Sequence, residues 1–206
     1  MNAITSIVAA LLISFSASNK KPLPEIEPGD IAPKADVSMK DVVSGNSYNL
    51  KDLVGEKGLI VIFTSNTCPY VIAWEDTYPE IAKMAKEKGI GAVLVNSNEA
   101  FRGEQDAPGA MRQKAEEGAY NMPYVIDETH VVADAFGAKT TPHVFLFDAE
   151  LVLVYKGAID DRYDGGMKET PEANWLSDAM EQLSKGVAIE KSTTRQIGCS
   201  IKRVKK

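Results

Sequence analysis

Apolar runs and amphipathic stretches alternate along the chain in a way that predicts one α/β domain. Residues 59–63 and 90–95 are continuous apolar runs, which are typical of strands buried on both faces of a sheet. Between them, residues 69–89 carry an apolar stripe at helical spacing that stops at Gly89. Pro79 falls inside this helix and predicts a kink or a break there.

The rest of the chain continues the same alternation. Shorter patterns predict a hairpin-like start at 41–50, helices at 107–118 and 131–136, and a strand at 123–127. Residues 143–147 and 151–155 read as strands with a very short connection, so they should pair as an antiparallel hairpin. A last helix is expected from Thr170 to Gly186, with Pro171 at its first position. This order predicts an α/β sandwich whose central mixed β-sheet is flanked by helices.

The N-terminal region has the pattern of an export signal. An apolar run over residues 4–15 is too short to span a bilayer comfortably, and small residues follow it. We therefore expect a signal peptide at 1–18, and an exported protein of the periplasm or the extracellular space, without stable membrane association after cleavage. An uncleaved membrane anchor is the alternative. Residues 19–35 carry four prolines, which favours an extended linker.

Composition limits the remaining possibilities. The chain has 206 residues, of which 25% are charged, and this suits one soluble domain, expected over residues 36–202. Its net charge of −6 gives no reason to expect nucleic-acid binding. The basic end at 203–206 is expected to be a solvated tail.

The two cysteines, Cys68 and Cys199, are the candidate reactive groups. Cys68 follows a buried strand and precedes Pro69, a favoured first helical residue, so it should lie at a helix N-terminus. There the unpaired N–H groups and the helix dipole favour a thiolate. Export to an oxidising compartment, together with an even number of cysteines, raises the expectation that Cys199 is the partner of Cys68. Gly198 allows a close backbone path beside Cys199.

Other polar residues give weaker signals. His130 and His143 are the only histidines and show no metal-ligand spacing, so no metal or other cofactor is expected, and both should be surface or strand-end residues. His143, directly after Pro142, could border the site. Glu75 and its neighbour Asp76 are expected to be solvated carboxylates, with a proton relay as the alternative. Two further expectations are that Trp74 is a packing residue and that Asp160-Asp161-Arg162 forms a surface loop.

Five segments of the chain form an ordered set: Ser65-Asn66-Thr67-Cys68-Pro69-Tyr70-Val71 with Trp74-Glu75-Asp76, Val95-Asn96-Ser97-Asn98, Thr141-Pro142-His143-Val144-Phe145, Ile159-Asp160-Asp161, and Gly198-Cys199-Ser200-Ile201-Lys202. With this set, residues 28–202 resemble the thioredoxin-like redoxins of the alkyl hydroperoxide reductase/thiol-specific antioxidant (AhpC/TSA) family.

The resemblance implies a set of site residues around Cys68. Pro142 matches the cis-proline that faces the active cysteine, and this should leave the Thr141 backbone free to pair with an extended substrate. The loop residues Asn66, Thr67 and Pro69 are expected to contribute to substrate binding. An assisting arginine is also implied, and three residues are eligible, namely Arg102, Arg112 and Arg162.

One position departs from the commonest pattern of these relatives. Many carry Cys-x-x-Cys, whereas this chain has Ser65 at the first position, so no vicinal dithiol can form. Ser65-x-x-Cys68 instead resembles the Thr-x-x-Cys of peroxiredoxins, in which the hydroxyl orients the thiolate or the peroxide. The match is partial, because Val61 stands where those proteins have proline.

The sequence thus predicts a thiol-based oxidoreductase in which Cys68 is the nucleophile and Cys199 the resolving thiol. The substrate is expected to be a protein disulfide or a peroxide, and the partners a redox partner protein or a thiol reductant. The alternative is a non-catalytic binding domain in which Cys68 and Cys199 form a structural disulfide.

Overall fold

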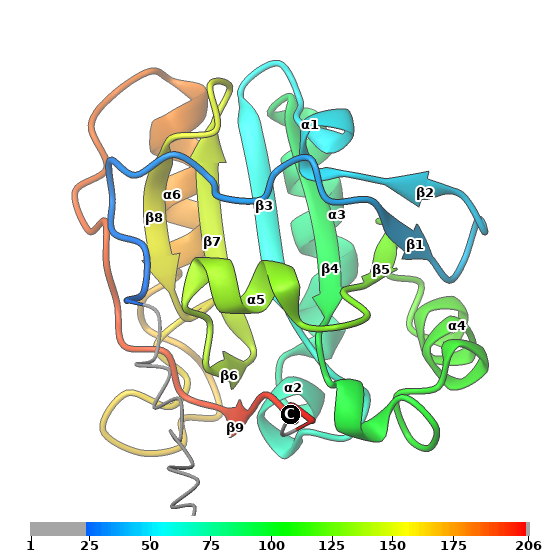
Figure 1. Cartoon of the computed structure of the whole chain (residues 1–206). Helices are drawn as coiled ribbons and strands as arrows, with labels where there is room; N and C mark the ends of the chain where they lie inside the picture. Colours follow the sequence, from blue (N-terminus) through cyan, green and yellow to red (C-terminus); the bar gives the residue numbers. More distant parts are fainter. Residues whose placement is uncertain (1–23, 205–206) are drawn as a thin grey trace, which may run out of the picture.

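The computed structural model describes residues 24–204 and contains a seven-stranded sheet in the order β2-β1-β5-β4-β3-β7-β8 (Figure 1). Its strands are β1 (Met39–Asp41), β2 (Ser47–Tyr48), β3 (Gly58–Phe63), β4 (Ile90–Asn96), β5 (Tyr124–Ile126), β7 (His143–Asp148) and β8 (Leu153–Gly157). Strand β4 runs parallel to β3 and β5, whereas β7 is antiparallel to both β3 and β8. The sheet is therefore mixed, as the sequence predicts.

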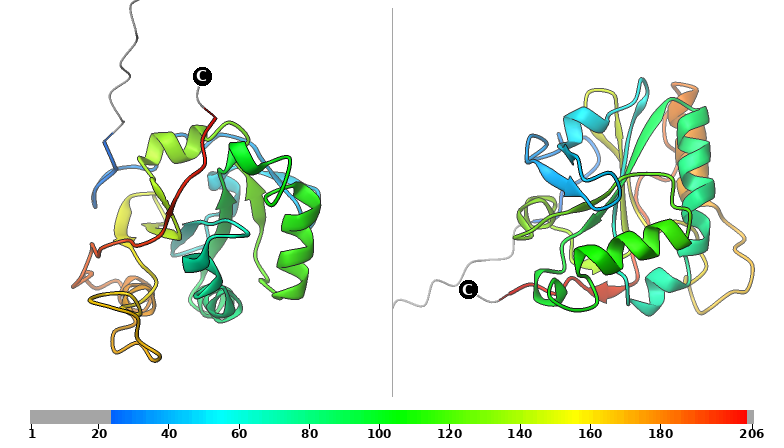
Figure 2. Two further views of the ribbon diagram at one scale, coloured as in Figure 1. Left: turned by 90° about the horizontal axis from the view of Figure 1, so that it is seen from below. Right: turned by 90° about the vertical axis from the view of Figure 1, so that its right-hand side faces the viewer.

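Helices cover both faces of this sheet, as Figure 2 shows. On β3, Ile60 and Ile62 point into a core shared with helices α3, α4 and α6, while the alternate residues point into a second core with helices α1 and α5. The helices are α1 (Leu50–Leu53), α3 (Tyr78–Glu87), α4 (Pro108–Glu117), α5 (Val131–Phe136) and α6 (Trp175–Ser184). Burial on both faces explains the continuous apolar run of this strand.

A second, two-stranded sheet lies at the end of the domain where β3 leads into helix α2 (Pro69–Ile72) (Figure 1). It pairs β6 (Thr140–Thr141) with β9 (Cys199–Ser200) in antiparallel orientation. Neither strand is predicted from the sequence, because two residues are too few to show a period. This small sheet brings Cys199 to the Cys68 end of the domain.

The helix expected at 69–89 is broken into three parts, α2, a 3₁₀ turn at η1 (Glu75–Thr77), and α3. The expected break is present, but it precedes Pro79, which lies in the first turn of α3. Proline is tolerated there because the N–H it lacks would have no partner within the helix. Between α2 and η1, Trp74 is buried and its indole N–H donates to the Asp160 carboxylate at 2.7 Å. Trp74 is thus a packing residue, as expected.

The last helix starts later than predicted. The expectation of a start at Thr170 with Pro171 as first residue is wrong, since α6 begins at Trp175. The N–H groups of Glu172 and Ala173 donate to the Asp161 carboxylate at 2.9 and 3.1 Å, which holds this segment outside the helix. Asp160 and Asp161 are therefore buried anchors, and the expectation of a surface loop is wrong at these two positions.

The segments before and after the predicted domain pack on it wherever the structure describes them. The predicted signal peptide, residues 19–23 and residues 205–206 lie outside the described residues. In the predicted linker, the N–H of Ile26 donates to the Phe136 carbonyl at 3.2 Å, and Ala32 is buried. At the other end, Arg203 donates to the Asp134 carboxylate at 2.7 Å. Among residues 24–204, no helix is both long and apolar enough to cross a membrane.

Candidate functional site

Cys68 is held at the start of α2 by contacts on both its backbone and its sulfur. It is the N-cap residue of this one-turn helix, and its side chain is 4% exposed. Its thiol donates a hydrogen bond to the carbonyl oxygen of Thr141 at 3.0 Å. Because only the protonated sulfur can donate, this contact is specific to the thiol form. The predicted position of Cys68 before a helix is confirmed, although the helix has only four residues.

Ser65 positions the backbone of Cys68 rather than its sulfur. The Ser65 hydroxyl accepts a hydrogen bond from the Cys68 N–H at 3.3 Å and lies 3.4 Å from the Thr141 hydroxyl. Since its lone pair accepts from the amide, its own proton is available to Thr141. The hydroxyl thereby ties the Cys68 loop to the β6 strand.

The Thr141–Pro142 peptide bond is cis, as the resemblance implies. The expectation that the Thr141 backbone is free for a substrate is wrong, because Thr141 is paired with Cys199 across the β6–β9 sheet. A Cβ atom on Gly198 would lie 2.2 Å from the Thr141 carbonyl oxygen, so only glycine permits this close approach. The chain itself therefore occupies the place expected for an extended substrate.

Cys199 is half-buried beside Cys68, and both cysteines are free thiols. Burial and the neighbouring Cys68 side chain raise the pKa of the Cys199 thiol to about 11, against the opposing influence of the Lys202 charge. At neutral pH Cys199 is therefore protonated. A protonated second thiol beside the first suits a resolving group, which reacts after the first has been oxidised.

The two thiols share a small cavity of about 110 Å³. Five of the site residues expected from the sequence lie together in its wall: Ser65, Thr67, Cys68, Thr141 and Cys199. Asn98, Phe101, Ser200 and Lys202 complete the lining. Of these four, all but Phe101 lie in segments that carry the resemblance, whereas Phe101 has no signal in the sequence. The cavity has room for a small reactive group next to both sulfur atoms.

Three of the expected substrate-binding residues, Asn66, Pro69 and Pro142, do not line this cavity. Asn66 points away from it, since its side chain donates to the Gln105 carbonyl at 2.8 Å and accepts from the Tyr124 hydroxyl at 3.0 Å. Pro69 is exposed at the head of α2. Asn66 therefore fixes the loop, and Thr67 is the loop residue that reaches the cavity.

A buried carboxylate that the sequence analysis did not single out links the Cys68 loop to the rest of the site. Asp106 is fully buried, and it accepts hydrogen bonds from the Asn66 N–H at 2.8 Å and from the Asn98 side chain at 2.9 Å. It also accepts from the Asn96 side chain at 2.8 Å. Nothing in the sequence distinguishes Asp106 from the other acidic residues of its region, so only the fold identifies it.

The three eligible arginines are engaged away from Cys68. Arg102 donates to the Asn96 and Asp106 carbonyls, Arg112 donates to the Val42 carbonyl, and Arg162 donates to the Ala73 carbonyl. Burial lowers the pKa of Arg102, against the opposing influence of Asp106. Within the described residues none of the three makes a hydrogen bond or an ion pair to a cysteine.

The histidine predictions hold only in part. His143 begins β7 but is completely buried, so it is not a surface residue, and it stacks on Phe145 with ring centroids 4.3 Å apart. Burial, with Lys156 and Lys139 nearby, lowers its pKa to about 3. His130 is half-buried before α5, where it contacts Asp134 at 2.9 Å. Neither histidine lines the cavity.

Glu75 does not reach the thiols either. Its carboxylate pairs with Lys114 at 2.8 Å and accepts from the Tyr120 hydroxyl at 3.3 Å. The neighbouring Asp76 is mostly exposed and lies 3.7 Å from Arg162. Both carboxylates thus have partners outside the cavity.

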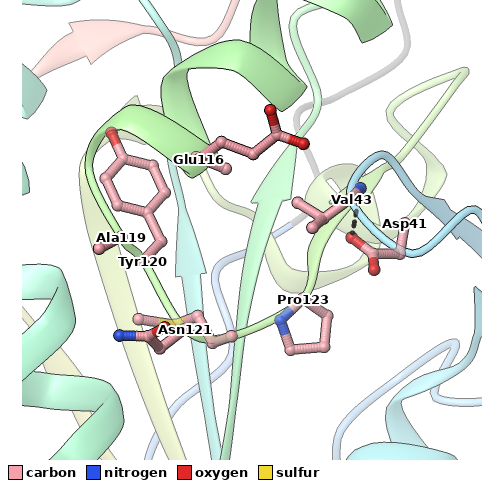
Figure 3. A pocket seen from close by; sticks show the side chains of 9 residues that line it. Asp41, Val43, Glu116, Ala119, Tyr120, Asn121 and Pro123 are labelled. Atoms are coloured by element: carbon pink, nitrogen blue, oxygen red, sulfur yellow. Dashed lines mark hydrogen bonds between the residues drawn. The ribbon is translucent and has the colours of Figure 1, made fainter.

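Larger hollows of the described surface lack comparable chemistry. One of about 510 Å³ lies between the turn after β1 and the end of α4, with Asp41, Glu116 and Tyr120 in its wall (Figure 3). The Asp41 carboxylate there accepts from the N–H groups of Val43 at 3.2 Å and Tyr124 at 2.9 Å, so it stabilises the turn. The smaller cavity with the two thiols is the candidate site.

Comparison with known proteins identifies the family of the chain. The family model described as AhpC/TSA matches residues 28–156. An uncharacterised conserved protein from Geobacillus kaustophilus is 34% identical, with a TM-score of 0.78 over 86% of this chain and 92% of its own. A hypothetical protein from Sinorhizobium meliloti is 30% identical, with a TM-score of 0.79 over 88% and 97%.

A more distant structure supports the fold. The peroxidoxin BcpB from Mycobacterium tuberculosis is 16% identical and superposes with a TM-score of 0.58, over 78% of this chain and 98% of its own. Among curated proteins, none matches the chain. The fold is thioredoxin-like, and the chain belongs to the AhpC/TSA family of thiol oxidoreductases and peroxidases.

Proposed function

We propose that this protein is an exported thiol oxidoreductase that cycles between a Cys68–Cys199 dithiol and the corresponding disulfide. Cys68 is the nucleophile and Cys199 the resolving thiol. The oxidising substrate is a disulfide or a hydroperoxide, and a thiol reductant restores the dithiol. Family membership supports the reaction class, and the geometry of the two cysteines supports their roles.

The observation that carries this proposal is the contact of one residue with both cysteines. Thr141 accepts a hydrogen bond from the Cys68 thiol at 3.0 Å and is the strand partner of Cys199. The two cysteines are thus neighbours in the fold although they are far apart in sequence. Both are free thiols, which is the reduced state from which the proposed cycle starts.

With a hydroperoxide, the Cys68 thiolate attacks one peroxide oxygen. An S–O bond forms, the O–O bond breaks, and the other oxygen leaves as an alcohol or water after taking up a proton. The Cys199 sulfur then attacks the Cys68 sulfenic acid, forming the disulfide and releasing water. An external dithiol reduces this disulfide in two exchange steps.

With a disulfide substrate, the first attack forms a mixed disulfide on Cys68 and releases one substrate thiol. Cys199 then attacks the Cys68 sulfur, which releases the second thiol and leaves the Cys68–Cys199 disulfide. The protonated state of Cys199 at neutral pH fits the order of these steps, because Cys199 acts second and must lose its proton as it attacks.

Export is proposed from the apolar segment at residues 4–15 and the small residues that follow it. Expression of the full chain in a bacterial host, followed by fractionation and mass measurement, tests it. Recovery from the periplasm or medium with the mass expected for cleavage near residue 18 supports export. Recovery of the full-length protein in the membrane fraction supports the uncleaved anchor instead.

The redox proposal is tested by replacing each cysteine with serine in the purified chain. Cys68→Ser should abolish both peroxide consumption and insulin disulfide reduction. Cys199→Ser should retain one reaction per molecule and leave a Cys68 sulfenic acid that a dimedone probe traps. Ser47→Ala, at an exposed position of β2 that does not line the cavity, is the control and should keep full turnover.

Two outcomes would contradict the proposal. Survival of both activities in Cys68→Ser would show that Cys68 is not the nucleophile. A Cys68–Cys199 disulfide that resists mild reductant, whose loss reduces stability but no activity, would favour the binding domain with a structural disulfide.

A further inference from the structure

The segment Gly198–Arg203, called the strap below, crosses the site end of the domain (Figure 2). Its residues Cys199 and Ser200 form β9 and pair with β6, and the next N–H, that of Ile201, donates to the Lys139 carbonyl at 2.9 Å. The Ile201 side chain is buried in the core under α5. The strap is therefore a bound strand rather than a solvated tail.

The strap pairs with β6, the strand whose Thr141 carbonyl oxygen accepts the hydrogen bond of the Cys68 thiol. An unpaired strand edge binds extended peptides by adding them as a further strand. Here that edge is taken by Cys199, and Gly198 lies so close to the Thr141 carbonyl that even a methyl group would not fit between them. A peptide can pair with Thr141 only if the strap leaves.

One buried side chain latches the strap to the Cys68 loop. The side-chain oxygen Oδ1 of Asn98 accepts a hydrogen bond from the Lys202 N–H at 2.8 Å, and the side-chain Nδ2 of Asn98 donates to the Asp106 carboxylate at 2.9 Å. The same carboxylate accepts the Asn66 N–H at 2.8 Å, two residues before Cys68. Asn98 is 3% exposed, so water cannot readily replace these bonds.

We propose that the latched strap determines substrate specificity and that Asn98 is the positioning residue that keeps it closed. With the strap in place, Cys68 reacts with small molecules that enter the cavity of about 110 Å³, and it discriminates against disulfides within extended peptides. Release of the strap opens the β6 edge to such peptides. This inference rests on the proposed function, since it requires Cys68 to be the nucleophile.

The test compares two probes with the same leaving group. One is hydroxyethyl disulfide, and the other is an eight-residue peptide whose central cysteine is disulfide-bonded to 2-mercaptoethanol. Both are reacted with the Cys199→Ser chain, so that the mixed disulfide on Cys68 accumulates. In the measured reaction, Cys68 sulfur bonds to one probe sulfur, the probe S–S bond breaks, and the other sulfur leaves as a thiolate that takes up a proton.

Adding Asn98→Ala should raise the rate constant for the peptide probe at least about tenfold, which is the effect of a latch worth one net hydrogen bond or more. Because Asn98 also lines the cavity, the readout is the ratio of the peptide rate constant to the small-probe rate constant, and this ratio should rise. The matched control is Asn46→Ala, which removes an exposed amide in the β1–β2 hairpin and should leave both rate constants unchanged. Lys202→Pro removes the same latch bond from the strap side, and it covers the case in which Asn98→Ala does not fold.

An unchanged ratio of the two rate constants in both latch variants would overturn the inference. An equal rise with both probes would also overturn it, because it would indicate general opening of the site rather than discrimination. If no mixed disulfide forms on Cys68 with either probe in any variant, the proposed function itself fails. If the small probe reacts with Cys68 but the ratio of the two rate constants does not change in the latch variants, the proposed function stands and only the role of the strap is rejected.

Discussion

Cys199 is the strand partner of Thr141, the residue whose carbonyl oxygen accepts the hydrogen bond of the Cys68 thiol. The small β6–β9 sheet therefore holds Cys199 at the same cavity as Cys68. It places a second thiol beside the first, although the chain has Ser65 where the loop cysteine would be. The dithiol exists only when the strap is docked.

Gly198→Ala should weaken the Cys68–Cys199 disulfide. The new methyl group would lie 2.2 Å from the Thr141 carbonyl oxygen, so strap or carbonyl must shift. Overpacking of this kind costs about 1–3 kcal/mol, which predicts a fall of about tenfold or more in the equilibrium constant for disulfide formation against glutathione. Gly109→Ala, where a Cβ meets nothing within 4 Å, is the control and should leave that constant unchanged. An unaltered constant in Gly198→Ala would show that the close approach is not needed.

Alkylation of Cys199 should be slow at neutral pH and accelerate up to about pH 11. The thiolate is the reactive form, and burial together with the Cys68 side chain raises the pKa of Cys199 to about 11. Mass spectrometry of iodoacetamide-treated reduced protein at several pH values measures this. The Cys68→Ser variant removes one of the causes but not burial, so its profile should move to lower pH without reaching that of an exposed cysteine. Full alkylation of Cys199 at pH 7 within the time needed for an unfolded control would contradict the prediction.

Buried His143 should make the fold less stable in acid. Its folded pKa is lowered to about 3 from an ordinary 6.5, so between these values the unfolded chain binds a proton that the folded chain does not. Stability is therefore fully present above about pH 6.5 and declines as the pH falls, at a limiting rate of about 1.4 kcal/mol per pH unit. Urea unfolding between pH 7 and 4 measures the slope.

His143→Phe supplies the comparison for this slope. It retains an aromatic ring beside Phe145 and removes the titrating group, so the stability of the variant should fall less steeply in acid. Tyr48→Phe changes a half-buried side chain that is neither a histidine nor a carboxylate, and it should keep the slope of the unaltered chain. Equal slopes for the two variants would show that His143 does not carry the acid sensitivity.

Glu75 should be dispensable for reaction at Cys68. Its carboxylate is paired with Lys114 and Tyr120, and it does not line the cavity. Glu75→Gln should therefore change the rate of Cys68 oxidation by less than about threefold, whereas loss of a general acid or base costs about a hundredfold or more. Stopped-flow measurement of the rate of peroxide or disulfide reduction distinguishes these two outcomes. A hundredfold loss of rate would support a proton-relay role for Glu75.

Much of the fold was predictable because its core strands are regular. The apolar runs that predict β3 and β4 are continuous, since these strands are buried on both faces. The errors fall where a long-range polar contact overrides the local pattern. The Asp161 carboxylate accepts hydrogen bonds from the N–H groups of Glu172 and Ala173, which holds these residues outside the helix expected from Thr170. The local sequence pattern does not predict this contact.

The position of Cys68 in the candidate site was predictable from the sequence, and the arrangement around it was less so. The position of Cys68 after a strand and before Pro69 is a local signal. The resemblance adds Thr141, Pro142 and Cys199, but not the pairing that joins them, because β6 and β9 have two residues each. The role of Asp106 depends on three donors, the Asn66 N–H and the side chains of Asn96 and Asn98, which come from two separate segments, so it becomes visible only in the folded chain.

The β6–β9 pairing also bears on the order in which parts of the structure can form while the chain folds. Strand β9 follows Cys68 by 131 positions (199 − 68), and all seven strands of the large sheet precede it. A chain that folds as it is synthesised can complete that sheet while Cys68 still lacks its strap. During that interval Cys68 lies next to a β6 strand that has not yet paired with β9.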